Sequence, residues 1–429
     1  MGGQSVWAVA EYIAYPLMMF AATPFLLRGL GSAQYGQYLL LLTFNGFGGI
    51  AGLGMGTAVV KEVSEARGRG DAEGAGAGVR SGLAVTLVAT ALLCMVLLAV
   101  GVVLGPNLLK RMGPPDTIRM LFVGAATLIA LEQVDLVFAS TLRGAERFDL
   151  SARIELASKS AIVATAVAAA WVWSSLSSVV VTTVTLTAVR CLAKGIIATK
   201  FLRQGWLIPR WDPPVVRRIF SFGVWTWGQA VGSALFGMAD RLLIGGMLGA
   251  DPLARYSVCL QLAQQITAVP AAAAQVLLPK VSRADAEGSD TIGGMAAKAM
   301  LILTTAAGIA ALCLIIFGHW ILWLWVGGDF AATGTPILTV LAIAFAVLAI
   351  NNVPHFVLLG LRRSRTVALV NISAGIIGLL VTWVAIRHWG LSAAAFGRLA
   401  YAIVICLLAR QMFSELRARG SSSPTFGEQ

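Results

Sequence analysis

The chain has 429 residues, of which 58% are hydrophobic and only 12% are charged, and its mean hydropathy is +0.82. Such a composition excludes a soluble globular domain of this length. The formal net charge of +12 would suit a nucleic-acid-binding protein. The basic residues are spread over short segments without a basic domain, however, so we expect no nucleic-acid partner.

Twelve long apolar runs follow one another along the chain. Each is close to the ~20 residues that a helix needs to cross the hydrocarbon core of a membrane. The runs cover residues 7–27, 38–60, 83–105, 119–141, 157–173, 178–199, 220–247, 257–279, 298–318, 334–359, 367–387 and 392–413. Their polarity does not alternate as barrel strands require. The sequence therefore predicts an all-α polytopic membrane protein with 12 transmembrane helices.

The basic residues set the orientation. Most of the 32 Lys and Arg residues lie in every second gap between the runs, starting with the gap after the second run, and in the C-terminal tail. Cytoplasmic segments carry this excess of positive charge. We therefore expect both termini to be cytoplasmic.

The two halves of the chain resemble each other. Short matches recur at a nearly constant offset: 30–38 with 248–256, 63–66 with 281–284, and Gly144 and Arg147 with Gly360 and Arg363. Six spans in each half give both halves the same direction, a parallel repeat that is common in transporters. We predict six-helix bundles over 1–205 and 220–414, a cytoplasmic interfacial linker over 206–219, and a cytoplasmic tail over 415–429.

Ionisable residues inside the predicted spans are costly and therefore mark candidate functional positions. The candidates for substrate binding are Arg190, Lys194, Arg241 and Tyr15. The candidates for coupling or for balancing charge in the cavity are Glu11, Glu132, Asp135 and Asp240. Arg190 and Lys194 share one stripe of their helix with Thr183 and Thr187, because the spacing of these positions is helical. A basic cavity would replace the solvation of an anionic head group.

Structural explanations stay open beside these roles. Lys194 would also reach the lipid head groups, Asp240 and Arg241 would also form structural ion pairs, and Glu132 would also lie close enough to the cytoplasm to be hydrated. Whether a coupling ion is H⁺ or Na⁺ stays open too. The isolated Cys and His residues predict neither a metal site nor a cofactor.

Several segments are similar to a known family. They are LLRGLG at 26–31 with Tyr35-Gly36, GLGMGTAVVKE at 52–62, LRGAERF at 142–148 and DRLLIG at 240–245. These segments resemble polysaccharide flippases of the O-antigen (Wzx) type, which belong to the multidrug/oligosaccharidyl-lipid/polysaccharide exporter superfamily. The resemblance covers most of the chain.

This resemblance implies two six-helix bundles around a central cavity that opens alternately to each side of the membrane. The implied substrate is a polyprenyl-pyrophosphate-linked oligosaccharide, moved from the inner to the outer leaflet of a bacterial cytoplasmic (inner) membrane. Family members often have a cationic cavity, to which Arg190, Lys194 and Arg241 would correspond. The partners so implied are this anionic lipid-linked glycan, the bilayer and the glycan polymerisation machinery.

Three other functions compete with this one. A cation-coupled multidrug exporter of the same superfamily would use the intramembrane acids as a net acidic cavity. A membrane-bound glycan polymerase or transferase would need a long outer loop with catalytic groups, and the longest outer gap, 319–333, holds one acid, Asp329. A scaffold would need no intramembrane charges. We therefore predict a transporter and not an enzyme.

Overall fold

The computed structural model describes residues 2–52, 54–202, 208–217, 237–287, 291–361 and 363–420, and for residues 2–15, 50, 51, 279, 286 and 418–420 it describes the backbone alone. These described residues form helices and no strand, which confirms the all-α fold class. The chain divides into two compact units, an N-terminal unit, Met1–Ala254, and a C-terminal unit, Arg255–Gln429. The predicted linker over 206–219 lies partly outside the described residues, so the predicted bundle boundaries stay a prediction.

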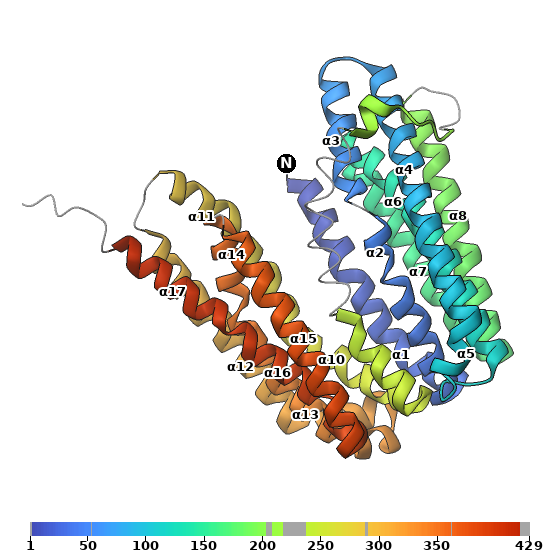
Figure 1. Ribbon diagram of the computed structural model, residues 1–429, viewed down its shortest axis with the longest axis vertical. Helices are drawn as coiled ribbons and strands as arrows, with labels where there is room; N and C mark the ends of the chain where they lie inside the picture. The colour runs from blue at the N-terminus through green and yellow to red at the C-terminus, as the bar shows by residue number, and fades with distance from the viewer. Residues whose placement is uncertain are drawn as a thin grey trace, which may run out of the picture. The chain divides into compact units, whose positions relative to one another are not determined.

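The N-terminal unit is a bundle of long helices joined by short turns (Figure 1). Its elements are α1 (Gly2–Asn45), α2 (Gly48–Ala51), α3 (Met55–Gly68), α4 (Ala72–Ala99), a π-helical turn (Val100–Leu104), α5 (Gly105–Leu108), α6 (Pro115–Gly144), α7 (Phe148–Trp173) and α8 (Leu176–Leu202). A further helical segment covers residues 237–248. The helix α10 (Ala250–Gln275) begins at the end of this unit.

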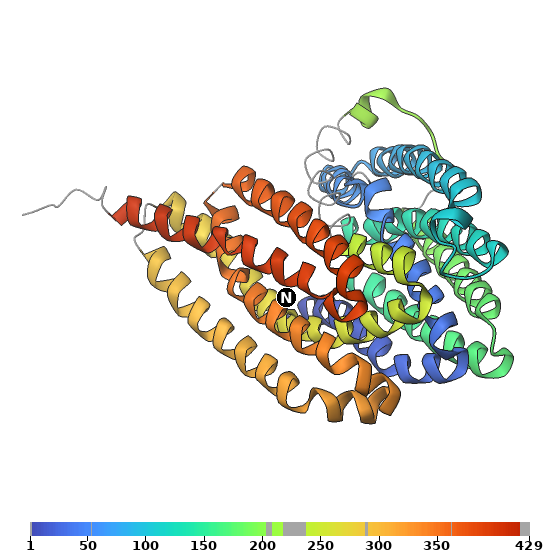
Figure 2. The same ribbon diagram turned by 60° about the horizontal axis from the view of Figure 1, so that its bottom comes forward.

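The C-terminal unit has the same general construction. It contains α11 (Leu277–Ala286), α12 (Thr291–Val326), α13 (Gly328–Ile350), α14 (Asn352–Gly360), α15 (Ser364–Trp389), a 3₁₀ turn η2 (Gly390–Ala393), α16 (Phe396–Ile405) and α17 (Leu407–Gly420). The helices α12 and α13 pack against each other, as do α15 and α16, and α13 also contacts α16 (Figures 1 and 2).

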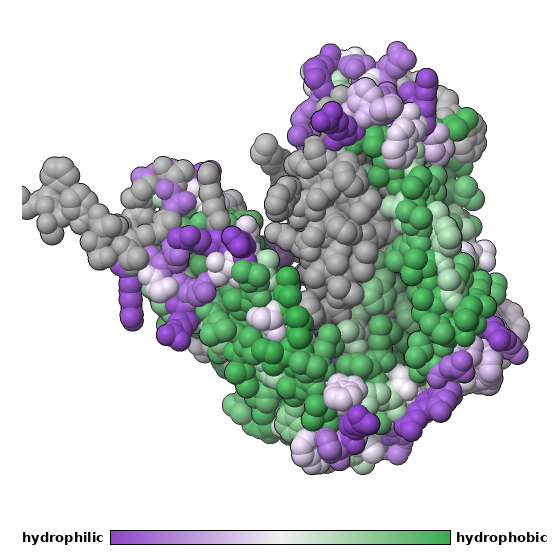
Figure 3. Space-filling model, in the orientation of Figure 1, coloured by the Kyte–Doolittle hydropathy of each residue, from purple (hydrophilic) through white to green (hydrophobic). Residues whose placement is uncertain are grey.

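Eight helical stretches among the described residues are long and apolar enough to cross a membrane. They start at Ala72, Pro115, Phe148, Leu176, Thr291, Gly328, Ser364 and Phe396. The other predicted spans fall on α1, on the segment 237–248 with the residues before it, and on α10. Hydrophobic side chains cover the helical flanks of each unit and hydrophilic ones gather at the helix ends (Figure 3). The protein is a multi-pass membrane protein.

The second predicted span is wrong in its detail. We predicted one continuous helix over 38–60, but α1 ends at Asn45, α2 is a single turn, and α3 begins only at Met55. Glycines at 46, 48, 49, 52 and 54 explain the break, because glycine is the least favourable residue after proline inside a helix. Conversely, α1 continues across the junction of the first two predicted spans, with a non-helical kink at Gly31 (φ 76°, ψ 165°).

The helix α6 occupies the centre of the N-terminal unit. It contacts α1, α3, α4, α7 and α8. Within its most apolar stretch 56% of the residues are buried, against 11% for the stretch of Ala72–Leu108, which faces outward. Some polar side chains of α6, such as Gln133 and Asp135, are therefore enclosed by protein instead of lipid, and this position determines the site described below.

The internal repeat predicted from the sequence is visible as a repeated contact. In the N-terminal unit the Ser64 hydroxyl of α3 donates a hydrogen bond to the carbonyl oxygen of Gly144 at the end of α6, at 3.1 Å. In the C-terminal unit the Ser282 hydroxyl of α11 donates to the carbonyl oxygen of Gly360 at the end of α14, at 3.4 Å. The valine before each serine is fully buried. The same helix crossing is thus built twice.

Turns with positive φ repeat as well. Gly31 pairs with Gly249, Gly113 with Gly327, and Ser174 with Gly390. The last pair differs in residue type. Ser174 adopts an ordinary left-handed conformation (φ 45°, ψ 36°), whereas Gly390 has φ 69° and ψ −149°.

We expect Gly390→Ser to lower the free energy of unfolding by about 1–3 kcal/mol, because only glycine readily adopts this conformation. Crowding is not the cause, since a Cβ at Gly390 would meet no atom within 4 Å. The matched exchange, Ser174→Gly, should raise stability by about 0.5 kcal/mol through relief of the left-handed strain. Equilibrium unfolding in mixed micelles measures both. Equal stability of Gly390→Ser and the unmodified protein would contradict the expectation.

Candidate functional site

The basic stripe predicted on α8 is present and buried. Thr183, Thr187, Arg190 and Lys194 all have at most 6% of their surface exposed. The two threonine hydroxyls donate to carbonyl oxygens one turn earlier in α8, at 2.7 and 2.8 Å, so they need no other partner. The two cations have no such local solution and must find anions on neighbouring helices.

Arg190 forms ion pairs with three carboxylates. Its Nη2 lies 3.8 Å from Glu132 Oε1, and its Nε lies 3.4 Å from Asp135 Oδ2. Its Nη1 lies 3.5 Å from Glu155 Oε1. Glu132 and Asp135 are three residues apart on α6 and so share a face, and Glu155 belongs to α7. One guanidinium therefore joins three helices.

Lys194 lies one turn further along α8 and is completely buried. Its Nζ donates to Asp135 Oδ2 at 2.8 Å and also to Glu155 Oε2. Lys159 of α7 approaches the other oxygen of Glu155, with its Nζ 2.9 Å from Oε1. Lys194 thus does not reach toward lipid head groups, which was the structural alternative for it.

Glu132 forms the accessible edge of this arrangement. Its side chain is 39% exposed, whereas those of Asp135 and Arg190 are 7% and 4% exposed. The amide of Asn45, the last residue of α1, donates to Glu132 Oε2 at 2.9 Å. The Arg190–Glu132 contact, at 3.8 Å, is the longest ion pair that Arg190 makes. Glu132 is therefore the carboxylate most easily exchanged.

We call these six charged residues the ionic cluster: Glu132, Asp135, Glu155, Lys159, Arg190 and Lys194. Three cations face three carboxylates, so the formal charge is zero, as burial in an apolar bundle requires. Hydrogen bonding is incomplete, because Asp135 Oδ1 and Arg190 Nε are buried without a hydrogen-bond partner. The cluster can exchange one anion for another at its Glu132 edge without leaving a cation bare.

The structure thus brings together four of the predicted residues: Arg190, Lys194, Glu132 and Asp135. The other predicted pair, Asp240 and Arg241, lies on the segment 237–248, where the Arg241 amide donates to Asp240 Oδ1 at 2.8 Å. The side chains of Glu11 and Tyr15 lie outside the description, although α1 carries their backbone. The functional roles of all eight residues stay predictions.

Sequence reasoning missed Glu155, Lys159 and Asn45. The predicted span started at residue 157, but α7 begins at Phe148, which carries Glu155 into the bundle. Lys159 lies inside the predicted span but was not counted among the charges within the spans. The spacing of one helical turn between Glu155 and Lys159 was a usable signal for an ion pair. In the part of the chain that the structure describes, no group of three or more His, Cys, Asp or Glu side chains is arranged to hold a metal ion.

Comparison with known proteins identifies the family of this chain. The model of the family described as "Polysaccharide biosynthesis protein" matches residues 3–285, well over half of the chain. A protein of Shigella flexneri described as "Putative O-antigen transporter" is 21% identical over 413 residues, which cover 96% of this chain and 97% of that protein.

Solved structures show the same fold at low sequence identity. The inward-facing structure of a multidrug resistance MATE family transporter of the MOP superfamily is 12% identical, with a TM-score of 0.74 over 96% of this chain and 99% of that one. A MOP superfamily transporter from Pyrococcus furiosus, titled for the reverse polarity of its binding pocket, is 14% identical, with a TM-score of 0.57 over 96% and 94%. The chain therefore belongs to the polysaccharide biosynthesis protein family, and it is a flippase-type transporter with the MOP fold, not an enzyme.

Proposed function

We propose that the protein is an alternating-access flippase that moves a polyprenyl-pyrophosphate-linked oligosaccharide from the inner to the outer leaflet of the bacterial cytoplasmic membrane, with both termini cytoplasmic. Two supports come from relatives: the family match, and the O-antigen transporter that resembles this chain along its length. The observation that carries the proposal is the burial of two cations, Arg190 and Lys194, beside one partly exposed carboxylate, Glu132.

The chemistry of the head group fits this arrangement. A pyrophosphate cannot enter hydrocarbon with its charge unpaired. A guanidinium binds phosphate oxygens through two parallel N–H donors, and such charge-assisted bonds are stronger than neutral ones. In our proposal the pyrophosphate displaces Glu132 from Arg190 at the accessible edge. Lys194 and Lys159 keep Asp135 and Glu155 neutralised throughout, so the rest of the ionic cluster stays paired.

Once displaced, the Glu132 carboxylate lacks its cation. Its neutralisation would couple translocation of the substrate to movement of a coupling cation. A proton or Na⁺ would neutralise the released carboxylate while the substrate holds Arg190. In the same proposal Asp135 balances charge, Tyr15 and Arg241 contact the substrate, and Glu11 and Asp240 serve as further coupling or cavity charges. Glycan polymerisation machinery would then receive the product in the outer leaflet.

The test is a leaflet-translocation assay in proteoliposomes. The substrate is a fluorescent polyprenyl-pyrophosphate oligosaccharide, and a membrane-impermeant quencher reports its outer-leaflet fraction, with and without a proton or Na⁺ gradient. We expect the double variant Arg190→Gln with Glu132→Gln to slow translocation about tenfold, the equivalent of one charge-assisted contact. This double variant removes one charge of each sign and so keeps the cluster neutral. Arg119→Ala, which breaks an exposed pair with Asp116, is the matched control.

A second function has its own support. Three carboxylates in one bundle, together with the MATE-type fold, suit a cation-coupled exporter of amphipathic cations. The same proteoliposomes decide between the two. Absence of glycolipid movement under every gradient, together with uptake of an amphipathic cation, would replace the first proposal by the second.

A further inference from the structure

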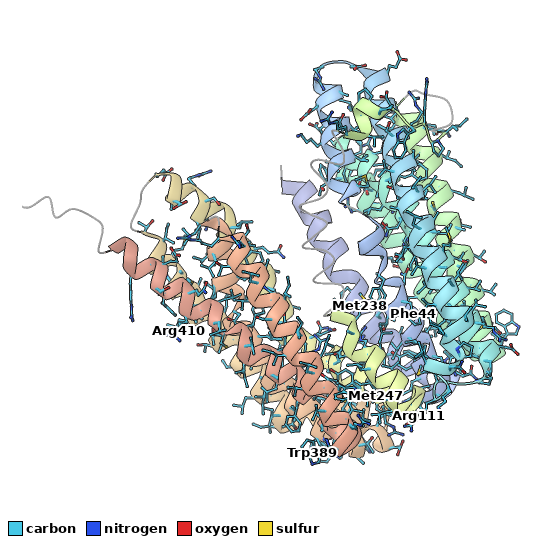
Figure 4. The ribbon with its side chains drawn as sticks, viewed as in Figure 1. Phe44, Arg111, Met238, Met247, Trp389 and Arg410 are labelled. Carbon is cyan, nitrogen blue, oxygen red and sulfur yellow. The ribbon has the colours of Figure 1, made fainter. Side chains whose placement is uncertain are left out.

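An apolar groove runs along the C-terminal unit between α13, α15, η2 and α16. Its volume is about 760 Å³, within the ~300–1,000 Å³ typical of ligand pockets. Pro336 and Val340 line it from α13, Leu380 and Val384 from α15, and Phe396 from α16. Trp389, labelled in Figure 4, lies at the end of α15, belongs to the lining and is 69% exposed.

The position of the groove identifies its occupant as a hydrocarbon chain. All the helices that line it belong to stretches able to cross a membrane. Ser392 supplies the only hydroxyl of the lining. In the hydrocarbon region of a membrane no water fills such a space, so a lipid chain must.

A cation stands beside the end of this groove. Arg387 lies in the last turn of α15, between the lining residues Ala385 and Trp389. Its guanidinium sits 5.2 Å above the ring of Trp383. Two other arginines of this unit have carboxylate partners: Arg255 pairs with Asp329 at 2.6 Å, and Arg363 pairs with Glu415 at 2.9 Å. Within the described residues Arg387 has no carboxylate partner. An exposed cation next to an apolar groove is complementary to an anionic lipid.

We infer that this groove holds the polyprenyl tail of the lipid-linked substrate, with Arg387 binding the phosphates at its end. The inference rests on the proposed function and specifies where the lipid part of the substrate lies. The groove is a single cavity and suits a lipid with one chain, whereas a phospholipid carries two. By the charge pattern of the sequence this end of α15 is the outer side, so the groove receives the tail in the outer leaflet.

Photo-crosslinking tests the inference directly and does not require transport. A diazirine-bearing polyprenyl pyrophosphate is incorporated into proteoliposomes, and adducts are mapped by mass spectrometry. We expect adducts on the groove residues of α13 and α15. An excess of unlabelled polyprenyl pyrophosphate should remove them, while the same excess of phosphatidylglycerol should not.

Variants then distinguish the effect of filling the groove from the effects of removing the charge and of disturbing the fold. Val340→Phe fills the groove, and we expect it to reduce labelling about tenfold. Ile343→Phe, on the same helix at a 41% exposed position outside the lining, is the matched control and should label normally. Leu380→Phe fills the groove from α15 and serves if Val340→Phe does not fold. Arg387→Ala should weaken labelling by the pyrophosphate while leaving labelling by an uncharged polyprenol analogue unchanged.

The outcomes distinguish this inference from the proposed function. Equal labelling of Val340→Phe, Leu380→Phe and the unmodified protein, or equal competition by phosphatidylglycerol, would mean that bulk lipid occupies the groove, and the inference fails. Normal translocation by both filled variants would also overturn it and leave the flippase proposal intact. Competed adducts in the groove without translocation by the unmodified protein would support the groove and contradict the flippase proposal.

Discussion

Replacing Lys194 by alanine should lower the free energy of unfolding by about 3–5 kcal/mol, the cost of leaving a buried charge without its partner. Lys194 is completely buried and donates to both Asp135 and Glu155. Without it, three carboxylates would share Arg190 and Lys159, and one negative charge would stay uncompensated inside the bundle. Equilibrium unfolding in mixed micelles measures the loss.

Two comparisons make the expectation specific to charge balance. The double variant Lys194→Met with Asp135→Asn removes one charge of each sign, and it should recover more than half of the stability that Lys194→Ala loses. Lys61→Ala breaks an ion pair with Glu65 whose two side chains are 51% exposed, so its effect should stay below about 1 kcal/mol. If the double variant is as unstable as Lys194→Ala, packing of the lysine stem and not its charge explains the loss.

The part of this site that the sequence predicted is the part with a helical period. Arg190 and Lys194 share their stripe with two threonines because residues four, three and four apart lie on one face of a helix. Glu132 and Asp135 face the same way for the same reason. Since a charge cannot be buried alone, acids and bases on apolar helices must meet, although the sequence does not say which acid meets which base.

What the sequence missed depends on where helices begin and how closely they approach. Glu155 was placed outside its span because hydropathy locates the edges of an apolar run, while α7 extends to Phe148 beyond that edge. Asn45 acquires its role only because α1 stops there and turns its amide toward Glu132. The groove near Arg387 is a property of packing among four elements, which no single stretch of sequence encodes.

One glycine of the Tyr35-Gly36 motif is required because two backbone segments approach each other closely there. Gly36, in the Tyr35-Gly36 motif, lies against the start of α10, where the backbone carbonyl of Ala250 occupies the space that a Cβ would need. Hydrogen bonds also hold the segments next to Gly36 and Ala250 in place. Gln37 Nε2 donates to the carbonyl oxygen of Met112, and the Arg111 guanidinium donates to the carbonyl oxygen of Met247. Figure 4 shows Arg111 and Met247 side by side.

We therefore expect Gly36→Ala to lower the free energy of unfolding by about 3 kcal/mol, at the upper end of the range for overpacking. The added methyl meets backbone atoms of Ala250, which cannot rotate away as a flexible side chain would. Gly308→Ala in α12 is the matched control, since a Cβ there meets nothing within 4 Å. That control should gain up to about 1 kcal/mol from helix propensity. Mixed-micelle unfolding of the two variants decides the matter, and similar stabilities would show that α1 and α10 do not approach through Gly36.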